Sequence, residues 1–359
     1  MQYYPDQRHL LEMTTIRRER MLPEDAIGRV EAREGTTVNL RDIVARGIVP
    51  SRYVIVEGAE FFKLKDPIDL MDLMSVEVGD TVDIKGPLAG KAGGRNKRLL
   101  SPVKGIVAHV GDGRVIIQVT PETVELEAGL DGQVIHVEPM RGVTIESFGA
   151  LVQGVWGNGR RVIGTLRMEP EEGLESIYGE ELDTQYRGTI LVTRRPLKET
   201  GLLIIEDQGL VGVIAPSMEA DLIDKVLNVG GAVMLTEGFG PIRMSASVST
   251  MLTGFNGRQA ALDAFLPDRW TAKRPEVIIN PSARAATRPP RPNVNVMLNS
   301  GTTVRLTRPP NQGQVGKIIN LPKTPHLLEN GLRVPCAQVE LITGEKVTVP
   351  LANLEVFGR

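Results

Sequence analysis

Short apolar runs separated by glycines recur in the same order between residues 99 and 145. An apolar run that begins at Gly105 is followed by a turn at 111–113 and a second apolar run, and the same order returns from Gly132. Each copy predicts a strand, a tight turn and a second strand. A single hairpin cannot bury its apolar face alone, so we expect the two copies to pack on each other as a small sandwich or barrel.

Each copy carries one histidine at the same place, His109 in the first and His136 in the second. If the copies pair, the two imidazoles come close together. Two histidines alone make a poor metal site, so we expect a polar cross-strand pair rather than a ligand set. The four histidines of the chain show no zinc-ligand spacing, and the single cysteine, Cys336, permits no internal disulfide.

The chain before this repeat also shows mostly strand patterns. Residues 26–56 have β periodicity, with a strong strand at 53–56, and residues 61–73 are compatible with one or two helical turns. The segment over 1–20 carries four arginines and predicts a short helix or a solvated arm. Those arginines are Arg8, Arg17, Arg18 and Arg20.

From residue 188 to residue 280 the period changes, and apolar strands alternate with helical patterns. Such alternation predicts a small parallel α/β layer. The expected strands are 189–192, 212–215, 232–236 and 276–279, and the expected helices are 217–228, 245–253 and 257–265. Just before this layer, Asn158-Gly159 predicts a tight hairpin turn between two strands.

In parallel sheets, ligands lie beyond the carboxyl ends of the strands, which points to the loops near residues 206 and 237. The candidate ligand-loop residues are Glu206, Asp207, Glu237, Gly238 and Gly240. The three acids can hold a divalent ion if their strands are neighbours, although ordinary turn and helix-start roles explain them more simply. Neither loop has the glycine pattern of a phosphate cradle. We therefore expect no metal and no cofactor.

Two connecting segments differ in composition from their surroundings. Residues 168–187 are rich in glutamate and predict a solvated connector. Residues 281–293 are rich in proline and arginine and predict an extended linker that either tethers two domains or lies on a nucleic-acid backbone. Its candidate phosphate contacts are Arg284, Arg288 and Arg291.

Two phrases near the repeat, Val78-Gly79-Asp80 and Ser101-Pro102-Val103, predict hairpin edges, with Gly79-Asp80 at a turn and Pro102 at a strand start. On these phrases residues 76–146 resemble the barrel-sandwich hybrid fold of biotinyl and lipoyl carrier domains. The residues that flank a carrier lysine are absent. A basic, glycine-rich loop over 85–98 can contact phosphates or be simply solvated, and we expect the latter.

The last part of the chain, residues 294–359, has five strand patterns, and Gly313 and Gly316 form a G-x-x-G-x-[IV] turn motif. A later hairpin turns at Thr343-Gly344, and the segment ends with a Val-Pro-Leu-x-Asn-Leu-Glu phrase. With these motifs it resembles a KOW domain, the five-stranded SH3-like barrel of NusG-type elongation factors and ribosomal proteins. It departs from that family in a longer insertion over 321–335. The resemblance implies docking on RNA or a partner through Arg305, Lys317 and Lys346.

Composition sets limits on these hypotheses. The chain of 359 residues is long enough for several domains, and its formal net charge of −2 gives no global attraction to nucleic acid, so such binding requires a local basic patch. Aromatic residues make up only 4%, which argues against a stacking platform for bases. The sequence has no basic-then-apolar leader and no run of about 18 apolar residues, so we expect a cytoplasmic protein without membrane contact.

We therefore expect a multidomain, mainly β chain with an α/β middle. Its expected parts are a β-rich region over 1–167 with the barrel-sandwich hybrid at 76–146, an acidic connector over 168–187, a parallel α/β domain over 188–280, a Pro/Arg linker over 281–293 and a KOW-like SH3 barrel over 294–359.

No catalytic triad and no paired general acid and base can be read from the chain. The leading hypothesis is a non-enzymatic binding or scaffold protein that docks on RNA, a ribosome or RNA polymerase through the KOW-like barrel. The alternatives are a protein–protein assembly module without nucleic acid, and a ligand- or metal-dependent enzyme or sensor at the α/β loops.

Overall fold

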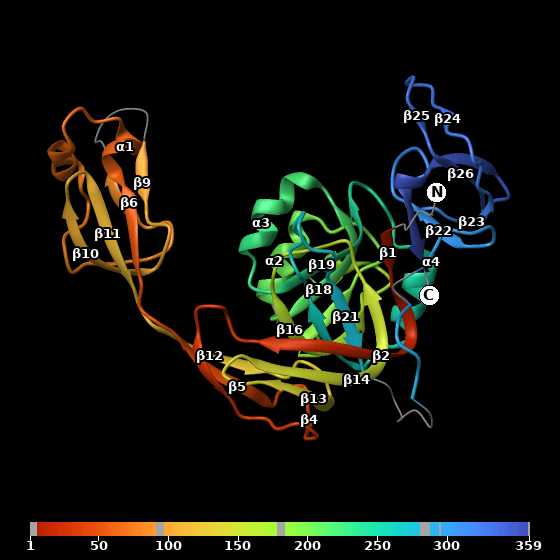
Figure 1. Cartoon of the computed structure of the whole chain (residues 1–359), viewed down its shortest axis with the longest axis horizontal. Coiled ribbons are helices and arrows are strands. Elements are labelled where there is room, and N and C mark those ends of the chain that lie inside the picture. Colours follow the sequence, from red (N-terminus) through yellow and green to blue (C-terminus); the bar gives the residue numbers. More distant parts are fainter. Residues whose placement is uncertain (1–5, 91–96, 178–183, 281–287, 294–295, 358–359) are drawn as a thin grey trace.

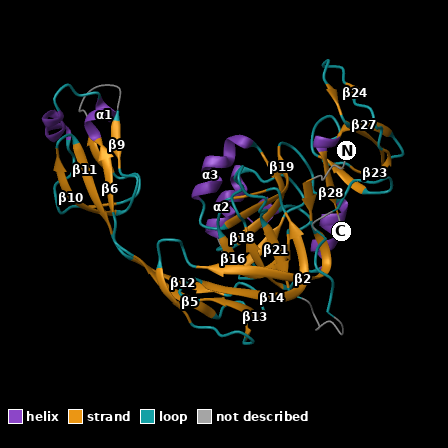
Figure 2. Ribbon diagram, in the orientation of Figure 1, coloured by secondary structure: helices purple, strands orange, loops and turns teal. Residues whose placement is uncertain are grey.

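The computed structural model describes residues 6–90, 97–177, 184–280, 288–293 and 296–357. Within these ranges the chain is mainly β, with several sheets and a few short helices, as the sequence predicts (Figures 1 and 2). The largest sheet has eleven strands, and a C-terminal sheet has six. No helix in the described ranges is both long enough and apolar enough to cross a membrane.

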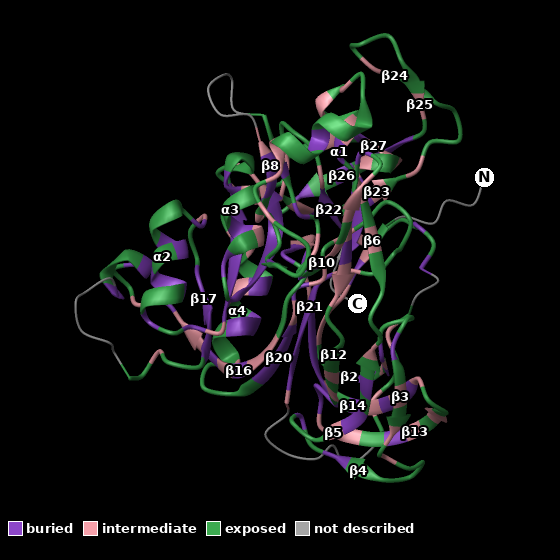
Figure 3. Ribbon diagram, turned by 90° about the vertical axis from the view of Figure 1, so that its left-hand side faces the viewer, coloured by how far each residue is buried: buried purple, intermediate pink, exposed green. Residues whose placement is uncertain are grey.

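Four parallel strands form one half of the eleven-stranded sheet. In spatial order they are β16 (Arg161–Met168), β17 (Thr189–Val192), β18 (Gly212–Met218) and β19 (Ala232–Phe239). The helices beside them are α2 (Glu199–Asp207), a 3-10 turn (Ala220–Leu222), α3 (Ile223–Asn228) and α4 (Ala246–Gly254). The strands are almost continuously apolar because both faces of the sheet are covered, by α2 and α3 on one side and by α4 on the other (Figure 3).

The remaining strands of this half are antiparallel. β20 (Gln259–Asp263) lies between β16 and β21 (Glu276–Ile279), and β21 pairs in turn with β14 (Gly142–Gln153). The helix expected over 257–265 is therefore wrong: its buried apolar residues fill a place in the sheet, and this pairing outweighs local preference. The helix expected from residue 217 begins only at Ile223, because β18 continues to Met218.

The hairpin expected at Asn158-Gly159 is absent. β15 (Trp156–Gly157) pairs with β19, whereas β16 pairs with β17 and β20. The buried Asn158 amide donates hydrogen bonds to the carbonyls of Val226 and Gly231 and accepts one from the Val233 N–H. The turn is thus fastened to the end of α3 and the start of β19.

The acidic connector is packed where the structure describes it. A 3-10 turn (Leu174–Ile177) buries Leu174 and Ile177 against the core beneath α2. The expectation of a fully solvated segment over 168–187 is wrong for this part, and residues 178–183 lie outside the described ranges.

The first described residues form strands, so the expectation of a helix or a solvated arm is wrong. β1 (Asp6–Arg8) pairs in parallel with β28 (Leu354–Phe357) at the edge of the C-terminal sheet. β2 (Leu10–Met21) then runs antiparallel to β14, with Leu10 opposite Val152 and Met21 opposite Gly142. Figure 1 shows these two long strands side by side.

Two small β modules follow, and the sequence of one, the outer module, is inserted between two parts of the other, the inner module. The inner module (residues 27–49 and 122–146) contains β3 (Ile27–Val30), β4 (Thr37–Val38), β5 (Ile43–Val49), β12 (Glu122–Glu127), β13 (Gly132–Glu138) and the first part of β14. The outer module (residues 53–119) contains β6 (Tyr53–Glu57), α1 (Gly58–Phe62), a 3-10 helix (Pro67–Leu73), β7 (Thr81–Val82), β8 (Pro87–Gly90), β9 (Arg98–Leu100), β10 (Gly105–Gly111) and β11 (Arg114–Val119). In Figure 1 the outer module stands away from the rest, joined to it next to the paired strands β5 and β12.

The two modules repeat one local geometry. β10 pairs with β7 and β11 as β13 pairs with β4 and β14, and each ladder has a register shift just before its histidine. A Cβ added at Gly105 would lie 2.3 Å from the carbonyl oxygen of Gln118, and one added at Gly132 would lie 2.3 Å from that of Glu146. The repeat in the sequence therefore corresponds to a three-strand arrangement that occurs once in each module.

The two copies do not pack on each other, however, so the expectation of one sandwich over 99–145 is wrong. β10 and β11 belong to a four-stranded sheet of the outer module, whereas β13 belongs to the eleven-stranded sheet, and the unit expected over 76–146 is divided between them. His109 and His136 consequently do not form a pair. His136 faces Glu34 instead, with 3.3 Å between Nδ1 and Oε1.

β1 and residues 296–357 form an open six-stranded sheet, where the sequence predicts a closed five-stranded barrel. Its order is β1, β28, β22 (Thr303–Leu306), β23 (Val315–Asn320), β26 (Cys336–Leu341) and β27 (Lys346–Pro350). One edge is capped by the N-terminal strand rather than by closure. The insertion over 321–335 carries a separate short hairpin of β24 (His326–Leu327) and β25 (Arg333–Val334).

Replacing Gly105 with Ala is expected to destabilise the outer module by about 2 kcal/mol, because the new Cβ overlaps a carbonyl oxygen of the neighbouring strand. Hydrogen exchange should accelerate in β6, β10 and β11 and stay unchanged in β16–β19. Gly132→Ala should destabilise the inner module for the same reason, because its Cβ overlaps the carbonyl oxygen of Glu146.

Gly254→Ala is the matched control, because a Cβ at this helix-terminal position meets nothing within 4 Å. It should change stability by no more than about 0.5 kcal/mol. Equal acceleration of exchange in all sheets by Gly105→Ala would contradict the division into modules.

Candidate functional site

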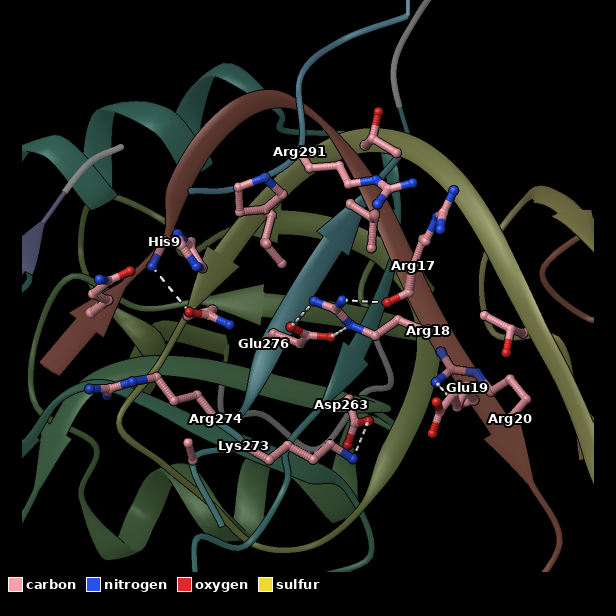
Figure 4. Close-up of a pocket in the computed structure, with 18 of the residues that line it drawn as sticks. His9, Arg17, Arg18, Glu19, Arg20, Asp263, Lys273, Arg274, Glu276 and Arg291 are labelled. Carbon is pink, nitrogen blue, oxygen red and sulfur yellow. Dashed lines mark hydrogen bonds and ion pairs between the residues drawn. The ribbon is translucent and has the colours of Figure 1, made fainter. Parts of the chain in front are cut away.

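A cleft with a volume of about 1190 Å³ lies against strand β2. One wall is formed by residues 15–21 of β2. The opposite wall comes from Arg161 of β16, Asp263 of β20 and residues 272–276, which lead into β21. Arg291 and Pro292 close it on a third side (Figure 4). We call this space the cationic cleft.

Positive side chains outnumber negative ones along the cleft. Its seven cationic residues are Arg17, Arg18, Arg20, Arg161, Lys273, Arg274 and Arg291, and its four acidic residues are Asp6, Glu19, Asp263 and Glu276. The whole chain carries a formal net charge of −2, so the three excess positive charges are a local feature. This is the local basic patch that such a chain needs if it is to bind nucleic acid.

Two of the cations are fixed deep in the wall. Arg18 forms a two-pronged ion pair with Glu276, in which Nη2 lies 2.6 Å from Oε2. Burial opposes the charge of Arg18, but the hydrogen bond and the charge of Glu276 outweigh it and raise the pKa of Arg18. The buried Arg20 donates to the carbonyl of Ala128, and burial, with the nearby charge of Arg161, lowers its pKa to about 10. Both groups are therefore charged at neutral pH.

The more exposed cations share their acidic partners. Glu146, on β14, is approached by Arg17 at 2.5 Å, by Arg291 at 4.0 Å and by Arg288. Burial raises the pKa of Glu146, but the hydrogen bonds from Arg17 and Arg288 more than offset this and lower it. Three arginines on one carboxylate leave two positive charges uncompensated.

The same sharing occurs at Asp263, which pairs with Arg161 at 2.9 Å and with Lys273 at 3.7 Å. The side chains of Arg17, Arg161, Lys273 and Arg291 are each about two-fifths or more exposed. Glu146 keeps Arg288 when Arg17 and Arg291 contact a ligand, and Asp263 keeps one of its two cations when the other does.

The Pro/Arg segment is placed here by hydrogen bonds to β2. The hydroxyl of Thr14 and the N–H of Thr15 donate to the carbonyl of Pro290, at 2.8 Å and 3.1 Å, and the hydroxyl of Thr15 donates to that of Pro289. Of the residues that the sequence predicts as phosphate contacts, Arg291 thereby lines the cleft, and Arg288 pairs with Glu146. The third predicted contact of this segment, Arg284, lies outside the described ranges.

A second charged group, the junction cluster, lies where the eleven-stranded sheet, called here the central sheet, meets the six-stranded C-terminal sheet. It consists of Arg8, Glu237, Arg274, Arg305 and Glu355. Glu355 accepts from Arg305 Nε at 2.9 Å and lies 2.8 Å from Nη2 of Arg274, and Glu237 pairs with Arg305. Arg274 also lines the cationic cleft, so the two groups adjoin.

Burial and neighbouring charges shift the pKa values of two residues of the junction cluster, Arg8 and Glu355. Burial, and next the charge of Arg305, lower the pKa of Arg8 to about 10, which leaves it charged at neutral pH. For Glu355, burial raises the pKa, but the charges of Arg8, Arg305 and Arg274 together lower it below its usual value. Arg8 and Glu355 are thus held in their charged forms in the interior, where each charge needs its partners.

The position of Arg305 contradicts the RNA contact that the resemblance predicts for it. Arg305 is only 3% exposed and is held by Glu237 and Glu355, so it serves the junction between sheets. Lys317 and Lys346 are exposed, on either side of Glu340 in register across β23, β26 and β27. They form a small polar face with one acid between two lysines.

The candidate ligand loop is also divided. Glu206 and Asp207 end α2, which leads to the start of β18, whereas Glu237 lies near the end of β19. Since β18 and β19 are parallel, Glu206 and Asp207 lie near the amino ends of these strands, whereas Glu237 lies near their carboxyl ends. Gly238 and Gly240 adopt positive φ angles of 117° and 103° and permit the turn after Glu237. No group of three or more His, Cys, Asp or Glu side chains among the described residues can hold a metal ion.

Most residues of the cationic cleft are not predicted as a site by the sequence. Arg17, Arg18 and Arg20 are visible as a basic N-terminal cluster, but no local pattern indicates that their strand pairs with β14. Arg161 and Lys273 meet only through the pairing of β16 with β20. The usable signal is charge density, with four arginines in the segment over 1–20.

Comparison with known proteins adds no family. No protein-family model matches the chain, and no curated protein matches it.

Glu355→Gln is expected to destabilise the C-terminal sheet by about 3 kcal/mol, because three arginines lose a buried carboxylate. Hydrogen exchange in β1, β22 and β28 measures this loss. Glu340→Gln, on the exposed face of the same sheet, is the control and should cost at most about 0.5 kcal/mol.

The junction should also respond to acid. Because the folded-state pKa of Glu355 is lowered, its stabilisation is complete above the ordinary glutamate pKa of about 4.3 and is lost as the pH falls through the lower folded value. Acid unfolding monitored in β22 and β28 should lose part of its pH dependence in Glu355→Gln. An unchanged acid profile would contradict the role given to Glu355.

Proposed function

We propose that this chain is a non-enzymatic binding protein that holds RNA in the cationic cleft and so docks on a transcription or translation machine. The observation that carries the proposal is the excess of three positive charges in one cleft of a chain whose formal net charge is −2. The four exposed cations of the cleft come from four separate segments, and an anionic backbone would neutralise them.

The way the cations are paired supports an anionic ligand. Arginine presents several N–H donors, and an arginine that shares its carboxylate with others keeps donors for a phosphate. Glu146 and Asp263 act in this way, each holding more than one cation in place. Binding would then need little reorganisation, because the side chains are already positioned.

We further propose that residues 294–359 are related to KOW-type domains, with an open sheet in place of the closed barrel, and that the inner and outer modules are related to barrel-sandwich hybrids. Support comes from the shared geometry of Gly105 and Gly132 and from Gly316, where a Cβ would lie 2.6 Å from the carbonyl oxygen of Glu340. In this proposal the C-terminal sheet closes the junction through Arg305, and Lys317 and Lys346 offer a secondary contact. A cytoplasmic location is consistent with RNA as the ligand.

A second candidate, protein–protein assembly, is favoured by the outer module. Tyr53, Ile55 and Ile106 are 64%, 56% and 41% exposed on the strands β6 and β10 that flank β11. An exposed apolar sheet face on a projecting module is typical of an interaction surface. It would let the same chain bridge RNA and a protein partner.

The double variant Lys273→Gln/Arg291→Gln should weaken binding of a single-stranded RNA. Each phosphate contact that the variant removes should make the slope of log affinity against log salt shallower by roughly 0.7, so the pair should change it by about 1–2 units. Fluorescence anisotropy over a range of salt concentrations measures this slope.

Lys317→Gln/Lys346→Gln removes the same charge from the C-terminal sheet and is the matched control. It should alter the slope by less than half as much. A larger effect of the control pair would move the RNA contact to the C-terminal sheet, and no salt-dependent binding by the parent chain would refute the proposal.

A further inference from the structure

We propose that the nucleic acid held by this chain is single-stranded and that one of its bases stacks on Trp270. This inference rests on the proposed function, which supplies the cationic cleft. It adds a recognition element that the charges alone do not provide, because stacking selects for a nucleobase with an open face.

Trp270 is the more exposed of the two tryptophans. It is 80% exposed, whereas Trp156 is half-buried and packs edge-on against Phe239 with ring centroids 5.7 Å apart. The guanidinium of Arg269 lies 4.4 Å from the Trp270 ring centroid. Most of the indole surface nevertheless remains open to solvent, and an indole gains much from being covered.

Trp270 is close along the chain to residues that line the cationic cleft. Trp270 precedes Ala272 by two positions, and residues 272–274 line the cleft. Two residues of chain span at most about 7 Å, so the Trp270 backbone lies close to the wall. A strand whose phosphates contact Lys273, three positions after Trp270, would therefore pass close to this tryptophan.

Hydrogen bonds hold the backbone of the rim loop (residues 265–274) at Trp270. The N–H groups of Trp270 and Thr271 both donate to Oδ1 of Asp268, at 2.6 Å and 2.9 Å. Lys273 Nζ lies 4.5 Å from the Phe265 ring centroid at the other end of the loop. A backbone held in this way loses little conformational freedom when a base stacks on the side chain that it carries.

The size of the cleft and the chemistry of stacking favour a single strand. At about 1190 Å³, the cleft exceeds the roughly 300–1,000 Å³ of pockets for one small molecule. In a duplex the bases already stack on each other, so an indole can reach a base face only in an unpaired strand. The low aromatic content of the chain, 4%, argues against a stacking platform, but one exposed indole next to a basic cleft is sufficient for one base.

The test uses the full chain with three probes: an oligouridylate of about 12 nucleotides, its abasic counterpart with the same phosphates, and a duplex of equal length. Intrinsic tryptophan fluorescence and anisotropy are recorded together. Trp156→Phe leaves Trp270 as the sole reporter, and its fluorescence should be quenched by the oligouridylate and much less by the abasic strand.

Trp270→Ala should weaken binding of the oligouridylate between about 5-fold and 100-fold, as expected for one stacked base, and leave the abasic strand unaffected. Trp270→Phe should recover most of the affinity, because it keeps an aromatic face. The exposed position of Trp270 means that these variants should fold normally.

Two results overturn the inference and are distinguishable. Equal affinity for the oligouridylate and the abasic strand, unchanged in Trp270→Ala, or a preference for the duplex, overturns the stacking role while the cleft still binds RNA. Absence of salt-dependent binding of every probe overturns the proposed function and, with it, this inference.

Discussion

The pairing of β2 with β14 is the constraint on which the rest of the structure depends. This ladder extends from Leu10 opposite Val152 to Met21 opposite Gly142 and crosses from the central sheet into the inner module. By holding the N-terminal strand in one register, it places Arg17, Arg18 and Arg20 along the cleft. A slip of one residue would turn Arg18 and Arg20, which share one face of the strand, to the other face.

The strand that precedes β2 in the chain, β1, ends at the junction cluster. Arg8 ends β1 and lies among Glu237, Arg305 and Glu355, so the N-terminus joins the central and C-terminal sheets before it enters the cleft. Arg274 is part of the junction cluster and also lines the cationic cleft. Buried ion pairs add little net stability compared with apolar packing, but they penalise any arrangement that separates the partners. The cluster therefore fixes how the two sheets meet, and so supports one side of the cleft.

The sequence predicts the strands that are defined locally and fails where partners are distant in the chain. The glycine-marked repeat is correctly interpreted as two hairpins, because Gly105 and Gly132 mark positions that tolerate no side chain. The prediction that these hairpins pack on each other is wrong. The first hairpin belongs to the module that is inserted between β5 and β12, and the second belongs to the eleven-stranded sheet. Arg305 and Glu237 are predicted as two unrelated sites, and they form one ion pair, which no local pattern can show. Likewise, composition indicates Arg288 and Arg291, but their meeting with Arg17 on Glu146 depends on tertiary pairing.

Ultraviolet cross-linking of single-stranded RNA to the intact chain, followed by mass spectrometry of the linked peptides, tests the central claim most directly. If the cationic cleft holds the RNA, linked peptides will come from β2, from residues 265–274 and from residues 288–293. Cross-links confined to the exposed face of β23, β26 and β27, or none at near-physiological salt, would contradict it.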